Sequence, residues 1–364
     1  MSATLPAAVR FHRLLEETAV TLQIAPEDLA GRFGLRRFAE RYTSGDAELL
    51  ATLWLHRTAH LRKEARAVSR ALTDSGVRHF FFKGIALVGR MYALEDRRLD
   101  DMDLMIDPAV RNAALATLHA LGYVALTDPA HPGPAALRPG ATMYRVDPIS
   151  GERDSDALLD VHWGLEPVTA LLPDDTLTLQ DGVWSGVEIQ NGLPVLQDEH
   201  HLALILHHLV RHDLAHVRGI LDFALLWESL PKRGGAELTA LAERLGVSRA
   251  LSVVGRVLVD DLGVFPLLGV RLGPVDWRSR AVLRHLRLRD WLAWAARTAR
   301  DERHHVTVNA ARSWRRYLLA DDRGTAARLV GELVRPPREY LRWRWPEART
   351  DAAAWRRHVV SLAS

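Results

Sequence analysis

Two carboxylates spaced two residues apart, just after a strand–glycine–helix pattern, constrain this chain more than any other feature. The aromatic run Phe80–Phe82 predicts a short strand, which leads through Lys83 and Gly84 into apolar spacing that is typical of a helix and continues to Tyr92. A second predicted strand follows and carries Asp101 and Asp103. Because successive strand side chains point to opposite faces, these carboxylates share one face and the apolar residues between and after them bury the other.

Two neighbouring carboxylates repel each other and keep both charges only if a cation lies between them. Magnesium, a hard ion with oxygen ligands, meets that need, and a Gly84 turn that opens a helix offers backbone N–H groups to a triphosphate. Alone, Asp-x-Asp is more often a solvated strand end, and Lys-Gly is ordinary turn chemistry. Together they predict a site for nucleotidyl transfer.

A third carboxylate, Asp160, is expected to complete this site. It lies in a β-rich run with His162 on the same face, and a Pro/Gly/Ser cluster separates this run from another at 141–147. A hairpin or two adjacent strands are therefore expected. If the sheet places Asp160 beside Asp101 and Asp103, three carboxylates surround two metal ions, the arrangement used for in-line displacement at phosphorus.

From about residue 75 onward the chain resembles the uncharacterised nucleotidyltransferase family of the DNA polymerase β-like superfamily. The motifs that carry the resemblance are Lys83-Gly84, Tyr92, Arg97, Asp101-Met102-Asp103 and Asp160-Val161-His162-Trp163, followed by Leu206-His207-His208, His212, Arg218, Asp222 and the segment 335–340. The resemblance implies an α+β fold, with a small mixed β-sheet core like that of polymerase β and helical regions on either side in sequence.

The resemblance also implies the chemistry of the site: two Mg²⁺ ions as cofactor and an NTP as co-substrate. Asp101 and Asp103 would bind both ions, and Asp160 would complete the metal site nearer the nucleophile. The wider superfamily has Gly-Ser after the first strand, whereas this chain has Gly84-Ile85. No hydroxyl can hold a phosphate there, so Lys83 or Arg97 is expected to do so.

Six histidines crowd the segment 200–216, and His208, His212 and His216 recur at the i+4 spacing that zinc-binding histidines use. No Glu lies between them as in zinc hydrolases, so zinc is the weaker interpretation. We expect His208 and His212 to contact the nucleotide or acceptor, with Asp222 nearby, and ordinary helix packing is the alternative. His162 is expected to support the Asp160 strand.

The chain of 364 residues contains no cysteine, which excludes disulfides and thiolate metal sites. Its first residues lack the apolar core of a signal peptide, and no apolar run is long enough to span a bilayer. A cytoplasmic protein without membrane association is expected. We predict three regions: N-terminal helices at 1–75, a nucleotidyltransferase core at 76–198 with a possible lid around 127–140, and C-terminal helices at 199–364.

The C-terminal quarter is basic and rich in tryptophan. Residues 271–364 hold 21 arginines against 10 acidic residues and seven of the eleven tryptophans, whereas residues 1–270 carry a net charge of −8. Basic residues interleaved with aromatics are one signature of nucleic-acid binding. Helical spacing of the tryptophans favours a packed helical core instead.

The function predicted from sequence is transfer of a nucleoside monophosphate from an NTP to a hydroxyl or phosphate of a small molecule or peptide. A second class is a binding or adaptor protein that keeps the fold and has lost turnover, since fold alone does not carry function. A nucleic-acid-directed transferase is the third, and strong salt dependence of its RNA or DNA binding would identify it.

Overall fold

The computed structural model describes residues 6–32, 35, 48–126, 140–146, 151–165, 181–212, 214, 216–230, 235–264, 269–270, 272–273, 276–285, 318–321, 324, 326–327, 330–331, 338, 341, 348 and 350–363. The chain forms two compact units. Unit 1 comprises Met1–Phe33, Pro167–Asp174 and Leu202–Ser364, and unit 2 comprises Gly34–Glu166 and Asp175–His201. The predicted division into three regions remains a prediction.

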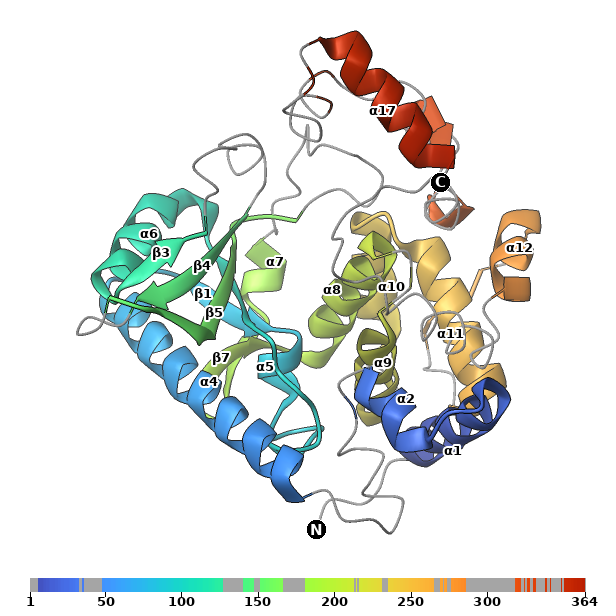
Figure 1. Cartoon of the computed structure of the whole chain (residues 1–364), viewed down its shortest axis with the longest axis horizontal. Helices are drawn as coiled ribbons and strands as arrows, with labels where there is room; N and C mark the ends of the chain where they lie inside the picture. The colour runs from blue at the N-terminus through green and yellow to red at the C-terminus, as the bar shows by residue number, and fades with distance from the viewer. Residues whose placement is uncertain are drawn as a thin grey trace. The chain divides into compact units, whose positions relative to one another are not determined.

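Unit 2 contains the sheet (Figure 1). Its elements in chain order are α4 (Glu48–Asp74), β1 (His79–Phe82), α5 (Gly84–Leu87), β2 (Met102–Ile106), the 3-10 helix η1 (Pro108–Val110), α6 (Arg111–Ala120), β3 (Tyr123–Ala125), β4 (Gly140–Val146), β5 (Arg153–His162), α7 (Asp181–Trp184), β6 (Val187–Gln190), β7 (Leu193–Leu196) and the first turn of α8 (Asp198–Arg211).

The seven strands lie in the order β3-β4-β5-β2-β1-β7-β6. The pairs β2–β5 and β1–β7 are parallel and the other four are antiparallel, so the sheet is mixed. The predicted hairpin of β4 and β5 is confirmed. The α+β class expected from the sequence is confirmed as well.

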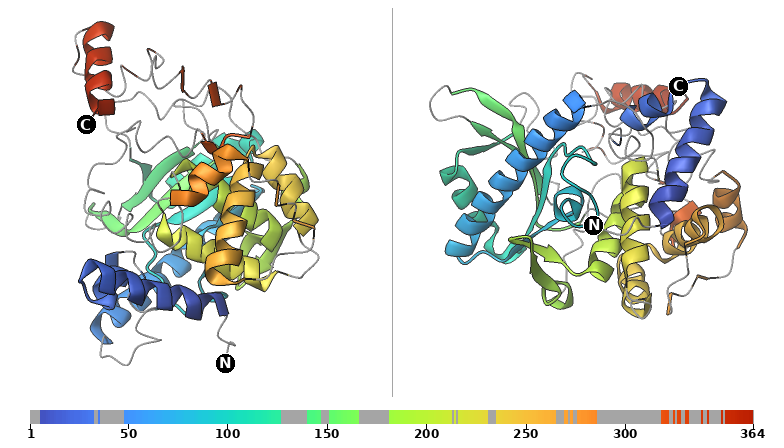
Figure 2. Two further views of the ribbon diagram at one scale, coloured as in Figure 1. Left: turned by 90° about the vertical axis from the view of Figure 1, so that its right-hand side faces the viewer. Right: turned by 90° about the horizontal axis from the view of Figure 1, so that it is seen from below.

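The long helix α4 covers one face of this sheet. Leu61, Ala65, Val68 and Leu72, spaced as one helical stripe, are fully buried, and α4 contacts β1, β5, β7 and α6. The right-hand view of Figure 2 shows α4 along the sheet. The Ser69 hydroxyl of α4 lies 2.9 Å from His79 Nε2, which marks the face of β1 that α4 covers.

The opposite face of the sheet is the one that carries the carboxylates. Because side chains alternate along β1, Phe80 and Phe82 point away from the face of His79. The Phe80 ring packs edge-on against Trp184 of α7, with centroids 5.0 Å apart. Phe82 lies opposite Asp103 of β2, so Asp103 projects from this second face.

The helix after Gly84 is shorter than its apolar spacing predicts. The sequence favours a helix as far as Tyr92, but α5 ends at Leu87 and Val88 is extended, with ψ 135°. Arg62 donates a hydrogen bond from Nη1 to the Val88 carbonyl (3.3 Å), and Gly89 adopts a positive φ of 82°. A tertiary contact and a glycine turn therefore end the helix after one turn.

Unit 1 is helical in its described part. Its elements are α1 (Pro6–Leu22), α2 (Pro26–Arg32), the remainder of α8, α9 (Val217–Ser229), α10 (Gly235–Arg244), α11 (Ser248–Leu262), α12 (Trp277–His285) and α17 (Asp351–Ala363). Helix α9 is buried along almost its whole length, and the rings of Phe223 and Trp227 lie tilted against each other with centroids 5.7 Å apart. Helix α1 packs on α9 and α11.

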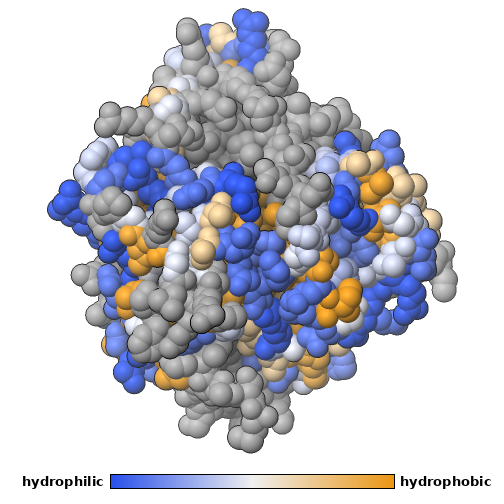
Figure 3. Space-filling view, turned by 180° about the vertical axis from the view of Figure 1, so that it is seen from behind, coloured by the Kyte–Doolittle hydropathy of each residue, from blue (hydrophilic) through white to orange (hydrophobic). Residues whose placement is uncertain are grey.

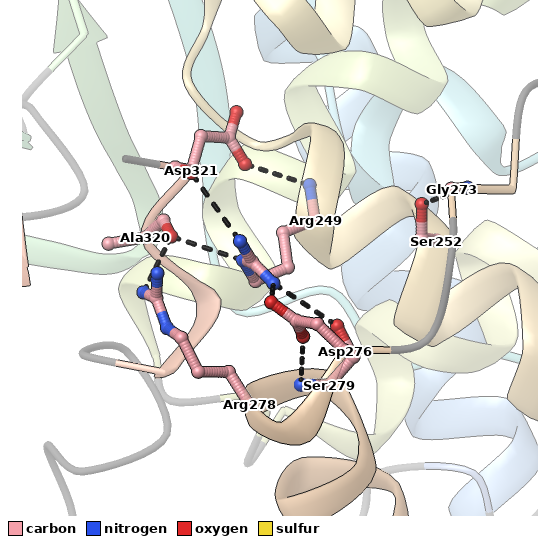
Figure 4. Close-up of polar contacts among 8 residues, drawn as sticks. All are labelled: Arg249, Ser252, Gly273, Asp276, Arg278, Ser279, Ala320 and Asp321. Atoms are coloured by element: carbon pink, nitrogen blue, oxygen red, sulfur yellow. Dashed lines mark hydrogen bonds and ion pairs between the residues drawn. The ribbon is translucent and has the colours of Figure 1, made fainter. Parts of the chain in front are cut away.

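A polar cluster around Arg249 joins three segments of unit 1 (Figure 4). The Asp321 carboxylate accepts hydrogen bonds from the backbone N–H groups of Ser248 (3.0 Å) and Arg249 (2.8 Å) and so caps the start of α11. The Arg249 guanidinium forms an ion pair with Asp276, which in turn accepts from the Ser279 N–H (2.8 Å) in the first turn of α12.

The tryptophans of the C-terminal quarter do not fit the packed interpretation where they are described. Trp277 is 62% exposed and Trp355 is 42% exposed, so for these two the expectation of a core position is wrong. The other five, and most of the predicted lid at 127–140, lie outside the described residues.

On the face shown in Figure 3, hydrophilic and hydrophobic residues are interspersed over the described surface. Among the described helices, none combines the length and the apolar character needed to cross a bilayer.

Candidate metal and nucleotide site

Neighbouring strands bring two of the three predicted carboxylates side by side. Asp103 of β2 is the register partner of Asp160 on the parallel strand β5 and of Phe82 on the antiparallel strand β1. Asp101 immediately precedes β2 and is close enough for Asp103 and Asp160 to shift its pKa. The structure therefore brings Asp103 and Asp160 together, whereas Asp101 lies outside the group whose ligand atoms come within 4.8 Å of one another. Asp101, Asp103 and Asp160 are called the carboxylate cluster below.

Lys83 enters this cluster from the end of β1. Its Nζ lies 2.5 Å from Asp103 Oδ1 and 5.2 Å from the centroid of the Phe82 ring. Its backbone has φ 55° and ψ −138°, a conformation that residues other than glycine rarely adopt. The Lys83 N–H donates to Nε2 of His201, in the first turn of α8, at 2.8 Å.

Charge is unevenly shared among these groups. Burial, with repulsion from Asp103 and Asp160, raises the pKa of Asp101 to about 7. Burial also opposes ionisation of Asp103, but Lys83 and then His162 outweigh it and lower the pKa of Asp103 to about 2. Lys83 is affected in the same way: burial disfavours its charge, and Asp103 and Asp101 nevertheless raise its pKa. One ammonium thus compensates only part of the negative charge.

The residues present fit a divalent cation. Asp103, Asp160 and His162 each offer a ligand atom, and these atoms lie within 4.8 Å of one another. Asp160 Oδ1 is buried and has no hydrogen-bond partner within the described part of the chain. His162 Nε2 lies 3.6 Å from Asp103 Oδ1. A hard cation would use the carboxylate oxygens and would compensate the charge that Lys83 leaves.

Gly84 is tightly constrained by Arg97. A Cβ at Gly84 would lie 2.2 Å from Arg97 Nη1 and 2.8 Å from a methyl carbon of Leu99. Arg97 is 5% exposed, and its guanidinium lies 5.9 Å from the centroid of the Tyr92 ring. The close approach of Arg97 is therefore a reason for glycine at position 84 that does not depend on phosphate binding. The predicted binding of phosphate by Arg97 stays a prediction.

The histidines of the segment 200–216 are divided between the two units. His208 and His212 belong to unit 1, so their predicted contact with substrate stays a prediction. The i+4 spacing does place His208, His212 and His216 together, with ring centroids 4.3 to 6.1 Å apart. In the described residues, the group that meets the spacing for a metal ion is Asp103, Asp160 and His162, not these three histidines.

His201 is the site residue that the sequence did not single out. It was one of six histidines in the same segment, and helical spacing did not distinguish it from its neighbours. Only the fold distinguishes it: His201 is 1% exposed, and its Nε2 accepts a hydrogen bond from the backbone N–H of Lys83, 118 positions earlier in the chain.

The comparison with protein families agrees with this geometry. A family model described as "Uncharacterised nucleotidyltransferase" matches residues 52–260, more than half of the chain. No curated protein and no solved structure matches the chain. The matched span includes β1, β2 and β5, and with them Lys83, Asp103 and Asp160. The chain therefore belongs to this uncharacterised family of nucleotidyltransferases.

Proposed function

We propose that the chain is a magnesium-dependent nucleotidyltransferase that moves a nucleoside monophosphate from an NTP to a hydroxyl or phosphate of a small molecule or peptide. The observation that carries the proposal is the register of Asp103 and Asp160 on adjacent parallel strands, with Lys83 at the end of the next strand. Buried ionisable groups whose pKa values are shifted strongly by one another cluster at functional sites, and Asp101 and Asp103 are shifted in opposite directions here.

In this reaction the acceptor oxygen forms a bond to the α-phosphorus, the bond from the α-phosphorus to pyrophosphate breaks, and the acceptor proton leaves to solvent. Asp101, Asp103 and Asp160 would hold two Mg²⁺ ions, which supply charge neutralisation at the acceptor oxygen and the leaving pyrophosphate. Lys83 would bind a phosphate oxygen, and Arg97 would add positive charge close to the Gly84 turn. Such positioning and charge compensation account for most of phosphoryl-type catalysis.

Mass spectrometry tests this proposal directly. The purified protein is incubated with each NTP, magnesium and a panel of acceptors, and the products are searched for a gain of one nucleotide. Pyrophosphate release that depends on Asp103 would support transfer. NTP binding without pyrophosphate release on any acceptor, including the protein itself, would instead favour a binding protein on this fold.

A further inference from the structure

Lys83 adopts a backbone conformation that costs energy for any residue with a side chain. Its φ of 55° and ψ of −138° lie in a region used almost only by glycine. The chain nevertheless has lysine there, directly between a buried strand and a one-turn helix. The conformation must therefore be held by its surroundings, because an isolated turn of this sequence would relax.

The first turn of α8 supplies the holding contacts. His201 Nε2 accepts the Lys83 N–H at 2.8 Å, and Asp198, one helical turn earlier, forms an ion pair with Arg90 beyond α5. The two contacts fix both ends of the segment 83–90, which contains Gly84. They lie within unit 2, together with the carboxylates.

His201 is suited to accept rather than donate at Nε2. Burial, together with the nearby charges of Arg90 and Arg97, lowers its pKa to about 3, although Asp103 acts in the opposite direction. The imidazole is therefore neutral near pH 7, with the proton on Nδ1 and a lone pair on Nε2. The Lys83 N–H can only donate, so Nε2, its partner, must carry the lone pair and Nδ1 the proton.

We infer that His201 is a positioning residue: it holds Lys83 in its strained turn and thereby directs the Lys83 ammonium at the carboxylate cluster and the triphosphate. Without this acceptor, the Lys83 backbone would relax to an ordinary conformation. The Lys83 side chain would then point elsewhere, and Nζ would no longer contact Asp103. The inference rests on the proposed function, because it takes the NTP to be the ligand that Lys83 binds.

A double-mutant cycle on NTP affinity separates this role from plain packing. Calorimetry with ATP, GTP, CTP and UTP in the presence of magnesium is done on the full-length wild type, His201→Leu, Lys83→Ala and the double variant. His201→Leu fills most of the volume but removes the acceptor. We expect it to weaken NTP binding by roughly tenfold, and the double variant to bind no worse than Lys83→Ala alone.

Two further variants complete the design. His201→Gln places an amide oxygen close to the position of Nε2 and should restore most of the affinity. His200→Leu, a neighbouring buried histidine that faces Gly186 and Gln197 rather than Lys83, should bind NTP within about twofold of wild type.

Additive losses in the cycle, or wild-type affinity in His201→Leu, would overturn the inference. So would failure of His201→Gln to bind better than His201→Leu when both are folded by circular dichroism. Absence of NTP binding in the wild type itself would overturn the proposed function and with it this inference, so the two failures are distinguishable.

Discussion

At the scale of single residues, the site depends on how few positive charges face its carboxylates. Lys83 is one of only three lysines in the chain, and it forms an ion pair with Asp103 in a setting where burial penalises both charges. Asp101 has its pKa raised towards neutrality because burial and its neighbours disfavour a further negative charge. A substitution of Lys83, Asp101 or Asp103 therefore changes the protonation of the other two as well as its own contacts.

Replacing Asp103 with Asn should abolish most turnover while the fold survives. The change removes a ligand charge but keeps the volume, and it relieves repulsion with Asp101 and Asp160. We expect pyrophosphate release to fall roughly a hundredfold or more. The matched control is Asp107→Asn, four residues further on, where the carboxylate pairs with Arg78 and caps η1. Wild-type turnover by Asp103→Asn would remove Asp103 from the site.

Replacing Gly84 with Ala should destabilise the turn that carries Lys83. The new Cβ would lie 2.2 Å from Arg97 Nη1, so the buried guanidinium must move. Overpacking of this kind costs about 1–3 kcal/mol in the free energy of unfolding, and NTP affinity should fall with it. Gly273→Ala is the control, since among the described residues its Cβ would meet Ser252 Oγ alone, at 3.5 Å. Equal denaturation midpoints for the two variants would contradict the clash.

At the scale of elements, the contact between α4 and β1 supports the strand that ends at Lys83. The apolar stripe of α4 buries one face of the sheet, and the Ser69–His79 hydrogen bond is a polar contact within it. Burial lowers the pKa of His79 below its ordinary value of 6.5, although its hydrogen bond to the Val77 carbonyl acts in the opposite direction. His79 is therefore held neutral in the folded state.

This contact should make unit 2 sensitive to acid. Below about pH 6.5 the unfolded chain protonates His79, whereas the folded chain does so only at a lower pH, so the free energy of unfolding falls as the pH falls towards the lowered pKa of the folded state. The contribution of this histidine is at most about 1.4 kcal/mol per pH unit. Chemical denaturation between pH 7.5 and 5.5 should show a shallower loss for His79→Asn than for wild type. Parallel curves would show that His79 does not contribute.

At the scale of the whole molecule, unit 1 depends on residues from the C-terminal quarter. Asp276, Ala320 and Asp321 supply the partners of Arg249 and the cap of α11. The basic, tryptophan-rich sequence of this quarter suggested either a nucleic-acid-binding arm or a packed region. Its described contacts with α11 favour a structural role for residues 276–285 and 318–321, although Trp277 and Trp355 are exposed.

A fragment of residues 1–270 should therefore be poorly soluble. It removes the Asp321 cap and leaves Arg249 without the acceptors it uses in the full chain, at a cost of about 1–2 kcal/mol for the cap alone. A fragment of residues 1–350 keeps these partners and should remain soluble, which provides the control. Size-exclusion chromatography and thermal melting would compare them. A soluble, monomeric 1–270 fragment with an unchanged melting temperature would contradict this structural role.

Local patterns in the sequence predicted several elements of the core. Turn residues between two β-rich runs predicted the hairpin of β4 and β5, which is confirmed, because turn chemistry depends on neighbouring residues. The predicted shared strand face of Asp101 and Asp103 stays a prediction, because β2 begins at Met102, one residue after Asp101. The same locality explains the failure at α5, where the apolar spacing continues to Tyr92 but a contact from Arg62 ends the helix.

Only the tertiary structure decided which of these elements meet. The parallel pairing that sets Asp103 beside Asp160 joins residues 57 positions apart, and the bond from Lys83 to His201 spans 118 positions. Neither can be read from periodicity, because each depends on how strands and helices pack after they form. The sequence by itself therefore determined the kind of residues at the site and their strand positions. The packing determined their pairing, the strained turn of Lys83 and the close contact of Arg97 with Gly84.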